Sequence, residues 1–510
     1  MATVKLDVAF RFGPLDIVAL SLCLAIGTLW YYYHHHRGRS QLPLPPGPEG
    51  LPLVGNALQI PGSKQWLAFD RWAKRYGTIY SDRPTAVMAG ELVGWSRGLG
   101  YTPSARSARF RAFRRLFARF LGLDDLVSAQ ERENARMLGR LAREPARFLA
   151  HFRDSTGALI LRLAYGYEAG REDGDGGGGG GGGKRDEMVR IAEEAMDGFA
   201  RASEPGRYWV DQFPILRYVP EWMPGAGFKA DAREMRRALE RLYDVPYAFV
   251  KEQVRERKAL KSFTSTYLEE RGGGRGAEGE ELIKAAAASL YSGGAETTPS
   301  SLAAFVLAMV LFPAVQIRAQ REIDALLDAD AEPARLPALA DRGSLPYVDA
   351  IVKEVYRWNP AVPLGLPHRL REEDAYRGWR VPRGTTVWAN IWAMLHDERY
   401  FPDPEAFRPE RYLDAEGWSR RRLEREEDPG EIAFGFGRRI CPGLHLADSS
   451  VFLGVATMLY AFRMSKARDE ETGEEITPVA DFDGFISHPK PFKCRIEPRT
   501  SAIAALLAQA

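Results

Sequence analysis

One ten-residue segment near the C-terminal end constrains this chain more than any other stretch. Residues 434–443 read FGFGRRICPG, so a single cysteine, Cys441, stands between Gly437 and Gly443 and shortly after two arginines. Glycine adopts backbone conformations that other residues disfavour, and it lets the backbone approach a flat ligand closely. The segment therefore predicts a tight loop that presents one sulfur atom beside positive charge.

A thiolate next to arginine suits a haem. The thiolate is a soft, anionic iron ligand, and a haem carries two carboxylates that need cationic partners. Arg439 could bind such a carboxylate through two parallel hydrogen bonds. A buried structural cysteine is the simpler alternative. Zinc is disfavoured because no second cysteine stands at ligand spacing, and a cysteine protease would need a partner histidine that nothing in the sequence singles out.

Composition sets broad limits on the fold and its partners. The chain has 510 residues, a net charge of +2 and 45% hydrophobic residues, which is ample for a large core. The near balance of charge gives no argument for nucleic-acid binding. Three cysteines, Cys23, Cys441 and Cys494, make no disulfide framework, so a reducing compartment is favoured.

The N-terminal segment predicts a membrane anchor. Residues 17–33 contain no charge and no proline, and they are about the shortest stretch that can cross a bilayer as a helix. Arg37 and Arg39 follow the span, which favours a cytosolic body. A cleaved secretory signal is the alternative, but no small-residue cleavage site follows. The histidines at 34–36 are expected to be a polar flank rather than a metal site.

The remaining organisation follows from prolines and glycines. We assign residues 1–39 to the anchor and its basic flank, 40–56 to a proline-rich hinge, 57–500 to one catalytic domain and 501–510 to a tail. Prolines stiffen the hinge; a proline-rich ligand for a partner is the competing interpretation. The glycine run within 174–183 predicts a flexible linker.

A long apolar helical stretch, residues 281–311, contains an irregular turn. Gly293 and Gly294 weaken the helix, and Pro299 cannot donate a hydrogen bond to the carbonyl of the preceding turn. We therefore expect a local bulge there, beside Glu296 and Thr297, whose acid and hydroxyl could carry protons. A packing kink with a helix-satisfied threonine is the simpler alternative.

These motifs together resemble the cytochrome P-450 family. The spacing Phe-x-x-Gly-x-Arg-x-Cys-x-Gly at 434–443 matches the loop that carries the axial haem ligand in that family. The general pattern is similar to microsomal fungal members of the O-methylsterigmatocystin oxidoreductase type. The resemblance implies a mainly α fold with small β-sheets, preceded by a single transmembrane helix.

The resemblance also implies roles for individual residues. Cys441 would bind the iron of haem b. The other haem-binding positions would be Arg439, Arg114, His368, Phe434 and Gly443. Phe110 stands where the family usually has tryptophan, so an indole hydrogen bond would be lost. Thr297 and Glu296 would be catalytic and deliver protons. Glu354, Arg357 and Arg411 would form a structural charged triad beneath the haem.

The implied function is a haem-dependent monooxygenase on the endoplasmic reticulum membrane, with a cytosolic catalytic domain. It would insert one atom of dioxygen into a lipophilic small molecule of secondary metabolism, using electrons from an NADPH-dependent reductase. One departure from the family favours an alternative. Between Gly77 and Tyr80 there is no room for two expected strands and a helix, and Thr385 would then begin a strand without a neighbour. The alternative is therefore a catalytically impaired haem-binding membrane protein.

Overall fold

The computed structural model describes residues 42–45, 63–69, 86–102, 104, 106–121, 125–169, 187–204, 206–270, 277–327 and 335–509. The predicted anchor at 1–39, most of the hinge, the glycine run and the Gly77–Tyr80 join lie outside the described residues. The chain divides into two units, one comprising Met1–Pro46 and Leu370–Thr385, the other Gly47–Arg369 and Thr386–Ala510. All candidate site residues belong to the second unit.

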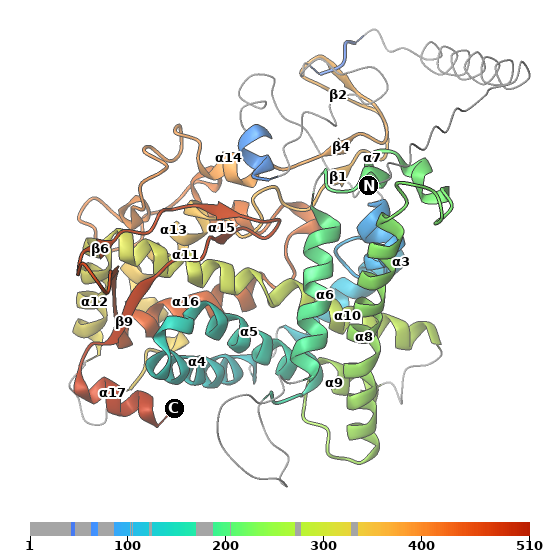
Figure 1. Ribbon diagram of the computed structural model, residues 1–510. Helices are drawn as coiled ribbons and strands as arrows, with labels where there is room; N and C mark the ends of the chain where they lie inside the picture. Colours follow the sequence, from blue (N-terminus) through green and yellow to red (C-terminus); the bar gives the residue numbers. More distant parts are fainter. Residues whose placement is uncertain are drawn as a thin grey trace, which may run out of the picture. The chain divides into compact units, whose positions relative to one another are not determined.

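Helices dominate the second unit (Figure 1). Its first half contains η2 (Val87–Val93), η3 (Trp95–Arg97), α3 (Ala108–Phe120), α4 (Asp125–Arg143), η4 (Pro145–Arg147), α5 (Phe148–Tyr165), α6 (Glu187–Ser203), α7 (Trp209–Gln212), η5 (Pro214–Tyr218), α8 (Phe228–Arg255) and α9 (Phe263–Glu270). Its second half contains α10 (Ala277–Gly294), α11 (Thr297–Leu311), α12 (Pro313–Leu326), η6 (Leu339–Ser344), α13 (Pro346–Trp358), α14 (Ile391–Leu395), η7 (Pro409–Tyr412), η8 (Arg425–Glu427), α15 (Pro429–Ala433), η9 (Gly437–Arg439), α16 (Leu444–Ala461) and α17 (Ser501–Ala508).

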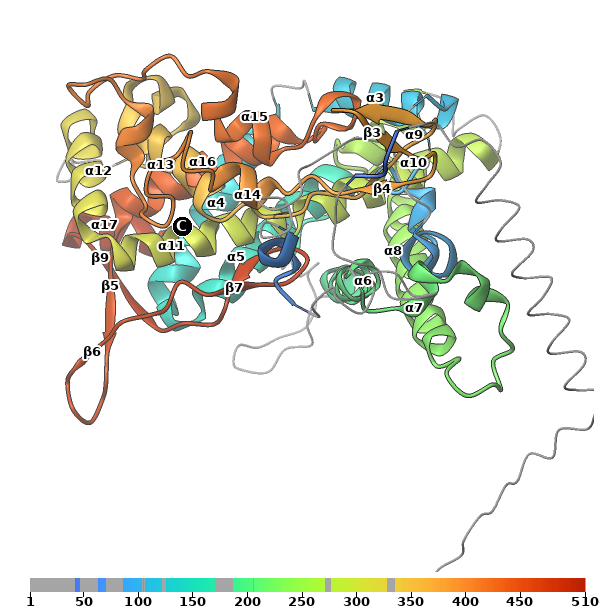
Figure 2. The same cartoon turned by 90° about the horizontal axis from the view of Figure 1, so that it is seen from above.

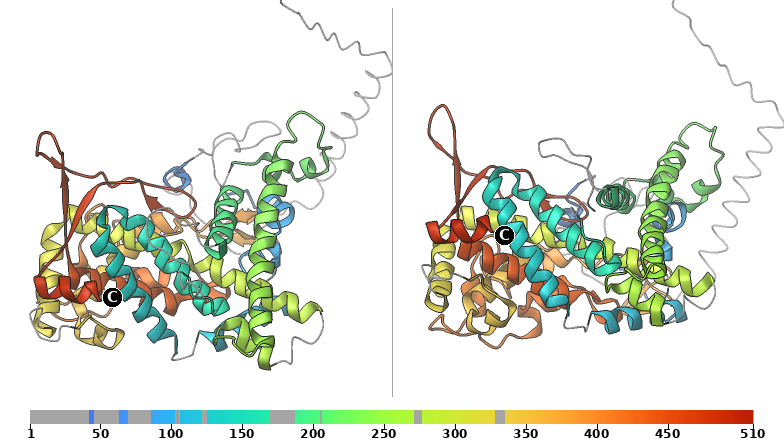
Figure 3. Two further views of the ribbon diagram at one scale, coloured as in Figure 1. Left: turned by 60° about the horizontal axis from the view of Figure 1, so that its bottom comes forward. Right: turned by 90° about the horizontal axis from the view of Figure 1, so that it is seen from below.

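The strands are short and form small antiparallel sheets. The second unit contains β1 (His368–Arg369), β4 (Thr386–Val387), β5 (Phe462–Arg468), β6 (Glu475–Ile476), β7 (Phe482–Asp483), β8 (His488–Pro489) and β9 (Cys494–Pro498). They pair as β1-β4, β6-β5-β9 and β7-β8. The three-stranded sheet lies at the same end of this unit as α17 (Figure 3). The mainly α class with small sheets is therefore confirmed.

The other unit is a hairpin in its described part. Strands β2 (Asp374–Tyr376) and β3 (Trp379–Val381) pair with Asp374 opposite Val381. The amide of Arg380 donates to the carbonyl of Pro43 at 2.7 Å, which ties the hinge to this hairpin.

Two sequence-based expectations concern strand β4 and the C-terminal segment 501–510. The strand that follows Thr385 does have a neighbour, because β4 pairs with β1 through His368 opposite Val387; the expectation that this strand would lack a neighbour was wrong. The segment assigned as a tail contains α17, in which Ile503 and Leu507 are buried against α4.

Two hydrophobic clusters form the core of the second unit. The first gathers residues of α11, α13, α16 and β5, while the second gathers residues of α3, α5, α6, α8 and α10. Helices α4 and α5 lie along α16 and α11 (Figure 1), and α6 packs against α8 (Figure 2). Within the described residues, the two stretches long and apolar enough to cross a membrane, Glu278–Leu311 and Leu444–Ala461, are largely buried in these clusters.

The break between α10 and α11 confirms the expected irregular turn. Helix α10 ends at Gly294 and α11 begins at Thr297, so Ala295 and Glu296 interrupt the helical stretch. Residues 283–295 contribute to one hydrophobic cluster, and residues 302–310 contribute to the other. The two halves of the stretch therefore belong to different cores.

A buried carboxylate fixes α13 to the segment that leads toward Cys441. Glu354 accepts hydrogen bonds from Arg357 at 2.8 and 2.9 Å and from Arg411 at 3.3 Å. It also accepts from the Tyr412 hydroxyl and the Arg408 amide, both at 2.8 Å. The side chains of Glu354 and Arg357 are 0% exposed. Such a pair is stable only because nearly every polar atom has a partner.

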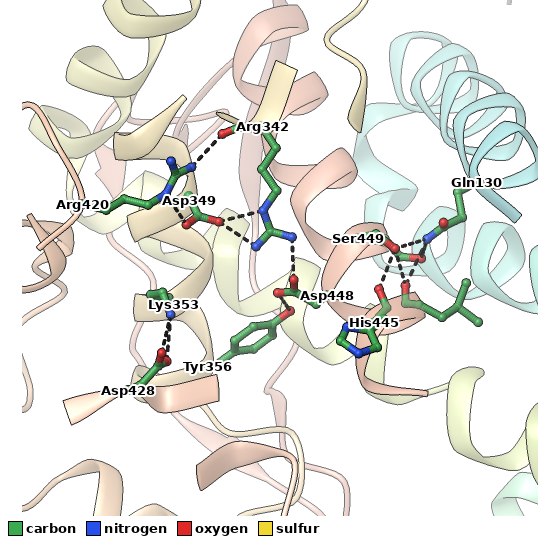
Figure 4. A network of polar contacts seen from close by, with 12 residues as sticks. Gln130, Arg342, Asp349, Lys353, Tyr356, Arg420, Asp428, His445, Asp448 and Ser449 are labelled. Atoms are coloured by element: carbon green, nitrogen blue, oxygen red, sulfur yellow. Dashed lines mark hydrogen bonds and ion pairs between the residues drawn. The ribbon is translucent and has the colours of Figure 1, made fainter. Parts of the chain in front are cut away.

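A second polar network ties the other side of α13 to its neighbours (Figure 4). Arg342 contacts Asp349 of α13 and Asp448 of α16, and Arg420 contacts Asp349 at 2.8 Å. Lys353 contacts Asp428, which caps α15. On α4, Gln130 donates to Ser449 of α16 at 2.7 Å. Helix α13 is thus held by two polar networks, and its Tyr356 packs against Phe434 at the start of the segment that carries the cysteine.

The first prediction concerns the Glu354 network. Glu354→Gln leaves the buried Arg357 without its counter-charge, so the free energy of unfolding should fall by about 3–5 kcal/mol. Lys353→Gln on the same helix breaks a partly exposed pair and should cost at most about 1 kcal/mol. Denaturant titration of both variants measures the difference. Equal costs for the two variants would contradict the structural role of Glu354.

The second prediction concerns a carboxylate that accepts a hydrogen bond from the first turn of η2. Asp211 of α7 accepts a hydrogen bond from the Met88 amide of η2 at 2.9 Å. Burial raises the pKa of Asp211 to about 6, although its hydrogen bonds to Met88 and Val87 act in the opposite direction. Its ionised form therefore destabilises the folded state as pH rises from about 4 to 6.

Asp211→Asn cannot ionise, so it should be more stable than the parent chain above pH 6. The shift of about two pKa units sets an upper limit of about 3 kcal/mol, and the gain should vanish as pH falls to about 4. Thermal unfolding across this range measures the difference. Asp211→Ala also removes the acceptor for Met88 and should lack the full gain. A gain of Asp211→Asn that does not change with pH would contradict the assignment.

Candidate haem-thiolate site

Backbone hydrogen bonds close the loop that carries Cys441. The Cys441 amide donates to the Phe434 carbonyl at 2.9 Å. Gly435 has φ +80° and Gly437 has φ +57°, a left-handed conformation that glycine adopts without steric cost. Gly443 ends the loop and directly precedes α16. The glycines predicted from the sequence thus let the chain turn back on itself and place the sulfur ahead of a helix.

Opposing effects act on the Cys441 thiol. Burial raises the pKa of Cys441, while a hydrogen bond from the Gly443 amide and the positive charge of Arg114 oppose that rise. Arg114 of α3 is held beside the loop because its Nη1 donates to the Ile440 carbonyl at 3.1 Å. The N-terminal end of α16 also favours negative charge. The surroundings therefore offset part of the cost of a buried thiolate.

Arg439 makes contacts that the sequence did not reveal. Its guanidinium donates to the carbonyls of Thr102 at 2.7 Å and Leu99 at 3.5 Å. It also lies 4.3 Å from the ring centre of Phe110. The phenylalanine that replaces the family tryptophan is therefore buried against this arginine, and cation–π attraction helps to fix the guanidinium.

The turn between α10 and α11 places Thr297 and Glu296 in different surroundings. The Thr297 hydroxyl donates to the Gly293 carbonyl at 3.0 Å, which is the helix-satisfied arrangement expected as the simpler alternative. Thr297 nevertheless lines the cavity described below. Glu296 instead faces Arg153 of α5 at 3.6 Å and His488 of β8 at 3.3 Å.

Cys441, Arg439 and Thr297 border one cavity of about 340 Å³. This volume lies within the range of small-molecule and cofactor sites. Most predicted residues line it, namely Cys441, Arg439, Arg114, His368, Phe434, Gly443 and Thr297. Glu296 and the charged triad are not among its described lining residues. Apolar residues complete the walls, including Trp95, Leu99, Ile160, Phe199, Phe485 and Ile486.

The donor set fits a haem. One sulfur, two guanidinium groups and one imidazole surround a hollow that is otherwise mostly apolar, and a haem presents an iron, two carboxylates and a flat apolar ring. Gly293 lines this hollow, and a Cβ atom placed there would meet no atom within 4 Å. The space beside this turn of the helix is therefore open. Within the described residues, no group of three or more His, Cys, Asp and Glu side chains could hold a bare metal ion.

Sequence reasoning missed the partners that come from distant segments. The Leu99 and Thr102 carbonyls carry no side-chain signal, so nothing in the sequence marks them as partners of Arg439. Arg153 and His488 lie far from Glu296 in the chain, and neither belongs to a recognisable motif. His488 is an isolated histidine in the sequence, and only the fold shows that it lies beside Glu296.

Comparisons with known proteins identify the class. The cytochrome P-450 family profile matches residues 183–496. Cytochrome P-450 monooxygenase 208 of Postia placenta is 42% identical over 92% of this chain and 94% of its own length. Cytochrome P-450 monooxygenase claR of Ampulloclitocybe clavipes is 39% identical over 91% and 88%. Tryptamine 4-monooxygenase of Psilocybe cyanescens is 34% identical over 96% and 98%.

The chain therefore belongs to the cytochrome P-450 family and is a monooxygenase. Its haem-dependent chemistry follows from that membership. The alternative of an impaired haem-binding protein gains no support from these relatives, which align with more than nine-tenths of the chain.

Proposed function

We propose that this chain uses haem b to insert one atom of dioxygen into a lipophilic small molecule of fungal secondary metabolism. The supporting observation is that Cys441 and Thr297 line the same mostly apolar cavity. The Cys441 sulfur, a soft iron ligand, and the Thr297 hydroxyl are thus available to the same bound cofactor and its substrate.

Several side chains would hold the cofactor. Cys441 would bind the iron as a thiolate, and Arg114, Arg439 and His368 would bind the carboxylates. Phe434 packs against Tyr356 with ring centres 5.2 Å apart and would support the ring. Gly443 would direct its amide to the sulfur. When bound, a thiolate-ligated haem supplies reduction of dioxygen and cleavage of its oxygen–oxygen bond.

Two adjacent residues would supply protons to the cavity. The side chain of Glu296 is 23% exposed, so its carboxylate can exchange protons with its surroundings. Thr297 Oγ1 would pass each proton into the cavity, after releasing its hydrogen bond to Gly293. General acid catalysis needs a donor within hydrogen-bond reach, directly or through one water.

The electrons would come from a separate protein. The sequence carries no flavin- or nicotinamide-binding signature beside the cysteine loop, so we propose an NADPH-dependent reductase as partner. Residues 17–33 would anchor this chain in the endoplasmic reticulum membrane, with its catalytic domain in the cytosol.

The cavity favours neutral, apolar substrates. No aspartate or glutamate is among its described lining residues, whereas Arg114 and Arg439 are. A protonated amine, such as the substrate named for the tryptamine relative, would find no counter-charge there. Spectral screening of lipophilic compounds against matched amines would test this preference.

The third prediction tests the cofactor. The reduced, carbon monoxide-bound protein should show the Soret band of a thiolate-ligated haem, and Cys441→Ala should lose that band. Cys494→Ala removes another partly buried cysteine and should leave the band intact. An imidazole-type band or no band in the parent chain would overturn the proposed function.

The fourth prediction tests the hydroxyl. Thr297→Ala should keep the thiolate-type band, but product formed per NADPH should fall by about tenfold or more, with hydrogen peroxide released instead. Ser301→Ala is a matched control, because its hydroxyl also donates to a helix carbonyl, that of Thr297. Full coupling in Thr297→Ala would show that the hydroxyl carries no proton.

A further inference from the structure

A charged cluster surrounds Glu296 at the break between α10 and α11. One oxygen of the Glu296 carboxylate faces two nitrogen-bearing side chains, Arg153 at 3.6 Å and His488 at 3.3 Å. Asp197 of α6 belongs to the same cluster, because burial and then the charge of Glu296 raise its pKa, while Arg153 and Arg201 act in the opposite direction. Elements α5, α6 and β8 therefore all present ionisable groups to this one acid.

These groups differ in their ability to carry a proton. A guanidinium keeps its proton in proteins, so Arg153 and Arg201 can hold the acid in place but cannot relay. Burial, followed by the charges of Glu296 and Glu193, raises the pKa of Tyr291 of α10, so that hydroxyl also retains its proton. Imidazole is the side chain that changes charge between about pH 5 and 8. Unlike the guanidinium groups and the tyrosine, the imidazole of His488 can both accept and release a proton.

The position of His488 is built into the fold. The preceding residue, Ser487, is 1% exposed, and its carbonyl accepts hydrogen bonds from Ser300 of α11 at 2.5 Å and from Asn359 at 3.1 Å. The Ser487 hydroxyl donates to Asn359 at 2.7 Å. Because Ser300 lies in the first turn of α11 and its amide donates to the Glu296 carbonyl at 3.1 Å, this network fixes His488 beside the acid.

His488 also has access to water. Its side chain is 23% exposed, as is that of Glu296. Two residues earlier on the same hairpin, Ile486 lines the cavity, whereas His488 is not among the described lining residues. The imidazole and the carboxylate therefore both reach solvent, and their 3.3 Å contact allows proton transfer directly or through one water.

We propose that His488 is the proton-entry residue of this monooxygenase, taking protons from solvent and delivering them to Glu296. The inference rests on the proposed function of Glu296 and Thr297. Each turnover consumes the substrate, dioxygen, two electrons from the reductase and two protons, and yields hydroxylated product and water. In each delivery, the imidazolium N–H bond breaks, a proton moves to Glu296 Oε2, and the neutral imidazole takes another proton from water.

The fifth prediction compares His488→Gln with the parent chain. Glutamine has similar reach but cannot ionise, so product formed per NADPH should fall by about tenfold at neutral pH, and its dependence on pH should flatten. Lys490→Gln alters the residue directly after β8, at an exposed pair with Asp481, and should behave like the parent chain. Asp197→Asn tests the other carboxylate as the entry point and should also keep the parental pH profile.

A second measurement does not depend on turnover. The chain has eight histidines, and the His488 resonance can be assigned in ring-labelled, ferrous carbon monoxide-bound protein by its loss in His488→Gln. In Glu296→Gln, the chemical shift of that resonance at fixed pH should change, because the carboxylate 3.3 Å from the imidazole is replaced by an amide. The carbon monoxide spectrum should stay thiolate-type in every variant.

The outcomes separate the two proposals. A missing thiolate-type band in the parent chain overturns the proposed function. With that band present, parental coupling and an unchanged pH profile in His488→Gln overturn the proton-entry role. An unchanged His488 resonance in Glu296→Gln also overturns it, because the imidazole would then not interact with the acid.

Discussion

The buried carboxylate of Glu354 is the constraint on which the rest of the site depends. It gathers Arg357 from its own helix, Arg411 and Tyr412 from η7 and the amide of Arg408. Charges without exposure to water are tolerated only when their partners are complete. The segment around η7 must therefore return to α13 before the chain continues toward Cys441. The position of the sulfur follows from this electrostatic requirement as much as from apolar packing.

Apolar packing then supports both sides of the cavity. The cysteine loop rests on the cluster that contains α13 and α16, with Phe434 and Phe436 packed against it. The opposite wall belongs to the cluster that contains α5 and α10, with Leu159 and Ile160 among its members. The break between α10 and α11 lies where these clusters meet, so the one irregular turn of a long buried stretch stands at the cavity.

Local patterns in the sequence indicated many residues of this site, whereas contacts between distant segments could not be predicted from the sequence. The glycines around Cys441, the weak turn before Pro299 and the three-residue spacing of Glu354 and Arg357 act within one loop or one helix, so their physical meaning is visible in the sequence. The Leu99 and Thr102 carbonyls that hold Arg439 are backbone groups, which any residue provides. Strand β4 pairs with the two-residue strand β1, whereas its expected neighbours were the strands missing between Gly77 and Tyr80. His488 gains significance only because a hydrogen-bonded serine holds its hairpin against α11.

The division of the core has an evolutionary consequence. Because the residues that present the sulfur and those that form the opposite wall are packed in separate clusters, substitutions in one cluster leave the packing of the other largely intact. Trp95, Leu159 and Ile160 can change the shape of the cavity, while Ile432 and Phe452 keep the loop in place. Substitutions in one half of the interior can thus reshape the cavity for new substrates, while the half that holds Cys441 keeps its packing.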